Sequence, residues 1–273
     1  MTYSSNVRGS RTTASTSFVS YDPDQKMSPE GFSDAMQQIG DQRYHNLHPF
    51  HKMLHGGELN HGQVQAWALN RYYYQASIPI KDLTLMARMP TAELRRAWRS
   101  RVLDHDGVDV ETGGISRYLQ LTDRLGLERD YVISTNGILP ATRYAVDAYI
   151  NFVTSHTLLE AIASSLTELF APAIHRERIK GLSKCYEWAD EYALAYFKKR
   201  LNEAPKDAKF GKAYVIREAR NRDQQELVLK AIRFKTDILW AQLDALSHAY
   251  VNPSIQTPDT FDPENYNFTP MDK

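Results

Sequence analysis

The chain has 273 residues, enough to bury one sizeable core and a length that fits one domain or two. Its 33 basic residues balance 33 acidic ones, so no overall field attracts nucleic acid or an anionic membrane, and anion recognition must be local. No window approaches the roughly 18 uninterrupted apolar residues that a membrane-spanning helix needs. These features exclude a nucleic-acid-binding or membrane role and favour a cytoplasmic protein.

The single cysteine, Cys185, excludes an internal disulfide and a cysteine-based metal cage. We expect it to be a buried structural thiol in a reducing cytosol. Residues 1–27 are rich in Ser, Thr and Arg and lack the apolar core of a secretory signal, so they predict a disordered tail. Residues 251–273 are rich in Pro, Asn and Asp and predict an irregular tail.

Between the tails, residues 28–250 show helical spacing of apolar positions almost throughout, which predicts an all-α protein made of one compact helical bundle. Ser28 and Pro29 begin the first helix as cap and first-turn residue. A second helix is expected over 44–55, ended by Gly56 and Gly57. The third runs from Asn60 to about residue 89, with a kink at Pro79.

A helix of about thirty residues, 141–171, is predicted between two prolines, and its mostly apolar circumference makes it the central element of the bundle. The remaining helices are expected over residues 91–109, 174–180, 188–203 and, with a break near Gly211, 207–250.

The run "YHNLHPFHKMLH" contains four histidines at helical spacing: His45, His48, His51 and His55. Spacings of three and four residues could place two imidazoles on one metal. Because no acidic ligand pattern accompanies them, partly exposed histidines on a helix surface are the favoured interpretation, with one of them entering a pocket.

Arg71 shares a helical face with Trp67, Tyr74 and Ile78, so its guanidinium would sit among apolar neighbours unless an anion meets it. Arg101 and His105 are four residues apart, and a guanidinium near the imidazole would keep it neutral and able to accept a proton. On spacing alone, a solvent-facing helix end is the favoured interpretation of that pair.

Other charged side chains have two interpretations each. Tyr196 with Arg200, and His175 with Arg178, share helical faces and would ordinarily be surface pairs. Lys235 has apolar residues three and four positions away on both sides, so its amine either reaches solvent or points into a pocket. Glu168 lies near the end of a buried helix and needs a partner. If these cations converge, the cavity suits a small polyanion.

The stretches "YHNLHPFH", "NRYYYQASIPIKD", "RVLDHDG", "RYAVDAYINF", "SSLTELFAP" and "FKTDILWAQLDA" occur in this order. On these motifs the chain resembles the pyrroloquinoline quinone synthase (PqqC) family of the haem-oxygenase-like superfamily over about residues 28–250. The resemblance implies an oxidoreductase that closes a ring in the polycarboxylate AHQQ and oxidises it with dioxygen to PQQ, releasing hydrogen peroxide. It also implies no metal or flavin cofactor, a homodimer, and closure of helices over the ligand.

The resemblance assigns roles to individual residues of this chain. His105 becomes the principal base and proton donor, Tyr196 and Arg200 stabilise reduced oxygen, and His175 assists proton removal. The implied substrate-binding residues are Tyr44, His45, Arg71, Gln75, Arg101, Tyr149, Thr167, Glu168, Arg178 and Lys235.

Two alternatives stay open at this point. Di-iron enzymes of the same superfamily carry a His-x3-Asp-x2-His pattern, whereas this chain has Tyr196, Arg200 and Glu203 at the corresponding spacing, which cannot form that cage. A non-enzymatic carrier of the finished quinone would use the same cationic pocket. A di-iron enzyme would contain two irons per chain, and a carrier would bind the quinone without consuming oxygen when given the precursor.

Overall fold

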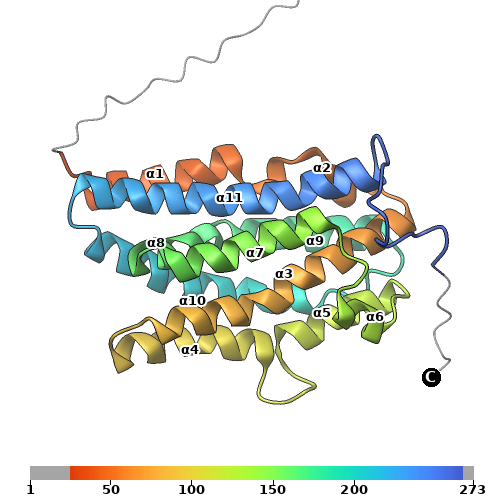
Figure 1. Cartoon of the computed structure of the whole chain (residues 1–273), viewed down its shortest axis with the longest axis horizontal. Helices are drawn as coiled ribbons and strands as arrows, with labels where there is room; N and C mark the ends of the chain where they lie inside the picture. The colour runs from red at the N-terminus through yellow and green to blue at the C-terminus, as the bar shows by residue number, and fades with distance from the viewer. Residues whose placement is uncertain (1–24, 267–273) are drawn as a thin grey trace, which may run out of the picture.

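The computed structural model describes residues 25–266, and within them all regular structure is helical (Figure 1). The all-α prediction is therefore confirmed. Predictions for residues 1–24 and 267–273 fall outside the described residues. The elements are α1 Pro29–Arg43, η1 His45–Leu47, α2 Pro49–Gly56, α3 His61–Ala87, α4 Ala92–Asp106, α5 Gly113–Arg124, α6 Arg129–Ser134, α7 Pro140–Ser155, α8 Leu158–Ala163, η2 Ser164–Leu169, α9 Ala171–Cys185, α10 Ala195–Glu218 and α11 Arg222–Tyr250.

Capping residues determine where the first helices begin. The Ser28 side chain accepts a hydrogen bond from the Gly31 N–H, and Pro29 takes the first turn of α1. Asn60 and Gln63 form a reciprocal capping box that starts α3. Each cap satisfies backbone N–H groups that have no partner inside the helix. These predicted starts are confirmed.

The helix expected over residues 44–55 is instead two elements, η1 and α2. His48 is extended (ψ 137°) before Pro49, because the proline ring disfavours helical backbone in the preceding residue. The chain turns there, and α2 ends at Gly57 in the left-handed conformation (φ 77°). The four histidines therefore do not share one continuous helix.

The prediction of a continuous thirty-residue central helix was also wrong. His156 is extended (ψ 171°), and Thr157 and Glu160 form a capping box that begins α8. The chain then continues as η2, a 3₁₀ helix that carries Thr167 and Glu168. The T-x-x-E capping signal is present in the sequence, and it outweighs the continuous apolar pattern.

The predicted break near Gly211 does not occur. Helix α10 begins at Ala195 rather than 188, and it runs through Pro205 and Gly211 to Glu218. A Cβ at Gly211 would lie 3.0 Å from Leu166, so this glycine allows α10 and η2 to approach closely. The true break follows Glu218, and Asn221 caps α11 through the Gln224 N–H.

The helices are arranged so that a central cavity lies between two groups of buried side chains. Helices α1 and α11 lie side by side, and α11 also packs on α7 and η2, while α3 packs on α4, α5 and α7 (Figure 1). One core cluster includes Trp67, Phe197 and Tyr196, and the other includes Tyr74 and Tyr149. Tyrosines of both clusters line the cavity where the clusters meet.

Residues 251–266 contain no helix or strand, yet they pack on the body of the protein. Phe261 is buried, its N–H donates to the Gly137 carbonyl, and its own carbonyl accepts from the Tyr250 hydroxyl. Cys185 is exposed, so the prediction of a buried thiol was wrong; it is the last residue of α9, three residues after the buried Leu182. Among the described residues, no helix is both long and apolar enough to cross a bilayer.

Candidate active site

A cavity of about 60 Å³ lies at the centre of the bundle, and its wall is made by η1, α3, α4, α7, η2, α9, α10 and α11. Thirteen of the fourteen predicted site residues line it: Tyr44, His45, Arg71, Arg101, His105, Tyr149, Thr167, Glu168, His175, Arg178, Tyr196, Arg200 and Lys235. The fourteenth, Gln75, lies behind the wall and accepts a 2.6 Å hydrogen bond from the Tyr196 hydroxyl. The surface pairs favoured on spacing alone are thus cavity residues.

One part of the wall holds cations that are paired with acids; we call Lys81, Arg101 and Arg200 the paired cations. Glu168 bridges two of them, because its two oxygens lie 2.7 Å from Arg101 Nη2 and 2.8 Å from Arg200 Nη2. Burial alone would raise the pKa of Glu168, but the two guanidiniums outweigh it and hold that pKa well below its usual range. The predicted need of Glu168 for a partner is met.

Two further carboxylates, Asp207 and Asp82, also belong to this paired part. Asp207 lies 3.4 Å from both guanidiniums, and burial together with the neighbouring Glu168 raises its pKa to about 7. Asp82 accepts hydrogen bonds from Lys81 (2.5 Å) and the Trp98 indole (2.8 Å). The buried charges here are compensated before any ligand binds.

The wall also holds Arg71, Arg178 and Lys235, which we call the unpaired cations. Within residues 25–266, none of the three makes an ion pair with an acid. Lys235 is 1% exposed, and its amine has no hydrogen-bond partner there; it lies over the rings of Tyr149 (3.6 Å) and Tyr74 (4.1 Å). Burial, and then Arg71, lowers its pKa well below the usual value.

The other two unpaired cations also contact rings. Arg71 lies 4.2 Å from the centre of the Tyr74 ring, and Arg178 lies over Trp67 and Phe197. Burial, followed by repulsion from Arg71, lowers the pKa of Arg178 to about 10. Aromatic faces hold these cations without neutralising them, so the positive charge of this wall is available to an anion.

His105 is oriented as a base. Its Nδ1 lies 3.0 Å from the Arg101 carbonyl, which can only accept, so Nδ1 carries the proton and Nε2 keeps a lone pair. Nε2 is buried without a hydrogen-bond partner. Burial, and then Arg200, lowers the pKa of His105 to about 4. The predicted neutral imidazole is present, but Arg200 rather than Arg101 supplies the repulsion, and the solvent-facing interpretation was wrong.

Two more neutral histidines face the cavity. Both ring nitrogens of His45 and Nδ1 of His175 are buried without hydrogen-bond partners. Burial lowers the pKa of each well below the usual value, with Arg71 adding to it at His45 and Arg178 at His175. The prediction of partly exposed histidines was wrong for His45, His48 and His51, which are at most 3% exposed.

Sequence reasoning missed Lys81 and Asp207 as members of this network. Lys81 lies ten residues after Arg71, on the helical face that also carries Tyr74 and Ile78. Asp207 lies seven residues after Arg200, again on one face of a helix. The periodicity of α3 and α10 could have identified both residues, since seven residues make nearly two helical turns.

The protein is thus an all-α protein with a buried cavity that combines the unpaired cations with neutral histidines. These features are typical of an enzyme active site that binds a small anion. Residues 33–245 match the family described as TENA/THI-4/PQQC, and the chain belongs to this family.

Three bacterial relatives are similar over most of the chain. The pyrroloquinoline-quinone synthase of Granulibacter bethesdensis is 56% identical over 87% of this chain and 93% of its own length, and that of Gluconobacter oxydans is 56% identical over 87% and 99%. The bifunctional coenzyme PQQ synthesis protein C/D of Methylorubrum extorquens is 54% identical over 87% of this chain and 64% of its own length.

Solved structures resemble the fold at low sequence identity. A domain with a heme oxygenase-like fold from Shewanella denitrificans has a TM-score of 0.66 at 12% identity, covering 87% of this chain and all of that one. A TenA homologue from Pseudomonas syringae has a TM-score of 0.65 at 9% identity, covering 84% and 99%. These likenesses confirm the predicted haem-oxygenase-like bundle.

Proposed function

We propose that this protein is a pyrroloquinoline-quinone synthase that closes the second ring of AHQQ and oxidises it with dioxygen to PQQ, with release of hydrogen peroxide. The observation that carries the proposal is a single cavity lined both by the unpaired cations and by a neutral His105 whose Nε2 has no hydrogen-bond partner. A polycarboxylate substrate matches the unpaired cations, and its need to lose protons matches the free lone pair of His105. The relatives that bear the synthase name at 56% identity support it.

In this proposal the unpaired cations bind the substrate carboxylates through charge-assisted hydrogen bonds. Arg71 and Arg178 supply several donors in a fixed geometry, and Lys235 supplies a compact donor between two tyrosine rings. Tyr44, His45, Gln75, Tyr149 and Thr167 complete the binding set. An anion on this wall also raises the depressed pKa of Lys235, which strengthens its charge on binding.

His105 is the principal proton-transfer group, with Nε2 as the accepting atom. Its pKa of about 4 in the ligand-free cavity is low for a base at neutral pH. A bound polycarboxylate would add negative charge and move this pKa toward the working range. His175 assists proton removal, while Tyr196 and Arg200 stabilise reduced oxygen by electrostatic contact.

We propose that the reaction needs no metal or organic cofactor, because the substrate supplies the electrons. The side chains on α10 at the spacing of the di-iron pattern are Tyr196, Arg200 and Glu203, and Glu203 lies 3.4 Å from Arg200. Glu168 and Asp207 are likewise engaged by arginines. This donor set suits anion binding and is a poor iron cage.

Ligand binding requires the cavity to widen. Its volume of about 60 Å³ is well below the roughly 300–1,000 Å³ of typical ligand sites. We therefore propose an opening and closing movement of the surrounding helices during turnover, in a cytoplasmic homodimer.

Anaerobic mixing of metal-free protein with AHQQ, followed by admission of oxygen, tests the function. The expected result is the PQQ absorbance spectrum together with oxygen uptake and peroxide. Binding of PQQ without oxygen consumption would identify a carrier instead. Activity that depends on added iron and is lost on chelation would identify a di-iron enzyme.

A further inference from the structure

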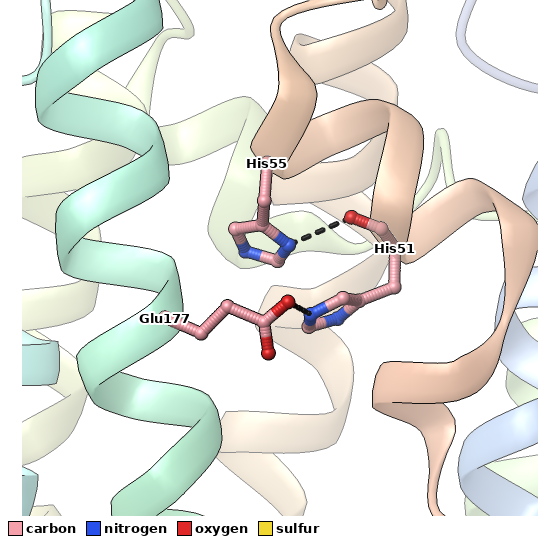
Figure 2. Close-up of side chains that lie close together, drawn as sticks. All are labelled: His51, His55 and Glu177. Carbon is pink, nitrogen blue, oxygen red and sulfur yellow. Dashed lines mark hydrogen bonds and ion pairs between the residues drawn. The ribbon is translucent and has the colours of Figure 1, made fainter.

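A second cluster of histidines and acid lies outside the cavity. His51 and His55 come from α2 and Glu177 from α9, and their side chains point toward one another (Figure 2). One ligand-type atom from each lies within 4.8 Å of the other two. His51 Nε2 is 3.4 Å from a Glu177 oxygen, close to the roughly 3.3 Å that separates two ligands of a tetrahedral zinc ion.

Each imidazole presents a ring nitrogen to this cluster. His55 Nδ1 lies 2.7 Å from the His51 carbonyl, so Nδ1 carries the proton and Nε2 keeps the lone pair (Figure 2). A backbone carbonyl that holds the far N–H is the usual support of a metal-binding histidine. His51 Nε2 is buried and has no hydrogen-bond partner.

We propose that His51, His55 and Glu177 bind a divalent transition-metal ion of the zinc class. Two imidazoles one helical turn apart and one carboxylate make a borderline nitrogen and oxygen donor set, which suits Zn²⁺ or Co²⁺. The Glu177 side chain is 45% exposed, so an ion can enter from solvent and water can complete its coordination. This site lies outside the cavity and supplies no step of the proposed reaction.

Arg178 links the metal site to the cavity. Its Nε donates to His55 Nε2 over 3.3 Å, so a metal on His55 replaces this hydrogen bond. Its guanidinium and the nearby Lys52 also repel a cation. Burial raises the pKa of Glu177, and these two positive charges offset only part of that rise. The site is thus expected to bind metal reversibly, in competition with Arg178.

Titration of the purified full chain with Co²⁺ tests the proposal directly, because four-coordinate Co²⁺ absorbs strongly in the visible range. We expect saturable binding of one ion, displaced by Zn²⁺. Glu177→Gln and His55→Gln should each weaken binding at least about tenfold. Arg178→Gln should tighten it, because the competing donor and the repelling charge are both removed.

Glu187→Gln and His248→Gln change exposed side chains of the same types and should leave binding unchanged. Circular dichroism of every variant separates loss of ligand from loss of fold. The proposal is overturned if no saturable signal develops up to about 1 mM Co²⁺, or if Glu177→Gln binds as tightly as the parent protein. Neither result depends on AHQQ turnover, so the proposed enzymatic function is judged separately.

Discussion

The two parts of the cavity wall treat positive charge in opposite ways. The paired cations are matched by Asp82, Glu168 and Asp207 at hydrogen-bonding or ion-pair distance. Among the described residues, no acid lies at such a distance from the unpaired cations. They lie against aromatic rings instead, and Arg178 also donates a hydrogen bond to the His55 imidazole. Arg178 and Lys235 are as buried as the paired cations, so for these two the difference lies in compensation rather than in exposure.

This difference separates two tasks. A buried charge without a counterion is costly, and Arg178 carries such a charge, which a ligand anion can compensate. A charge that is already matched contributes little to anion binding, but it holds the surrounding groups in place. We infer that the unpaired part binds the carboxylates and that the paired part orients His105 and Arg200 for chemistry.

Replacement of His105 by Asn should produce the largest effect. The variant should still bind the polycarboxylate, because the unpaired cations remain, but complete turnover should fall by about 10²–10⁴-fold as proton transfer is lost. Stopped-flow spectra should show a stalled intermediate. His248→Asn, an exposed change on α11, is the control. Undiminished turnover would refute the role of His105.

Replacement of Glu168 by Gln should chiefly affect stability. It removes the carboxylate that bridges Arg101 and Arg200 and leaves buried positive charge, at a cost of about 3 kcal/mol in the free energy of unfolding. Urea denaturation measures this change. Glu218→Gln breaks an exposed pair with Arg217 and should cost less than about 1 kcal/mol. If both substitutions lowered the free energy of unfolding equally, the buried ion pairs of Glu168 would not stabilise the fold more than an exposed pair does.

Replacement of Arg71 by Ala should have the opposite profile. Ligand affinity should weaken by about 1.5–3 kcal/mol through loss of a charge-assisted contact, while stability changes little because no ion pair is broken. Equilibrium titration with PQQ, alongside urea denaturation, gives both values. Arg99→Ala, which changes an exposed arginine of α4, is the control. An unchanged affinity would place Arg71 outside the ligand site.

The smallest effect should come from Asp207 and should depend on pH. Its raised pKa, about 7, means that the folded protein keeps a proton which the unfolded chain releases near pH 4. Stability is therefore lost as pH rises between these values, and Asp207→Asn should lack this loss. The variant should gain about 1–2 kcal/mol relative to the parent between pH 4.5 and 7.5, measured by urea denaturation.

Exposed Asp34→Asn should follow the parent protein at both pH values. A pH-independent difference in stability between Asp207→Asn and the parent would contradict the raised pKa of Asp207.

Much of the fold could be predicted because caps and apolar periodicity are local signals. Ser28 and Asn60 start helices where their side chains predict, and the misplaced boundaries lie where a second local signal was overlooked, as at Thr157 and Glu160. At Gly211 the reason is not local, since only the packing of α10 on η2 shows why a glycine is needed.

The candidate site divides in the same way. Helical spacing by itself identified Arg71 and Lys235 as charged side chains among apolar neighbours, whereas the resemblance of the motifs to a known family assigned them, with His105, to one site. Only the tertiary structure decided which cations are compensated, since Glu168 and Asp207 are brought to Arg101 from distant parts of the chain. Compensation depends on distances of a few ångströms between separate helices, and no single-helix pattern contains those distances.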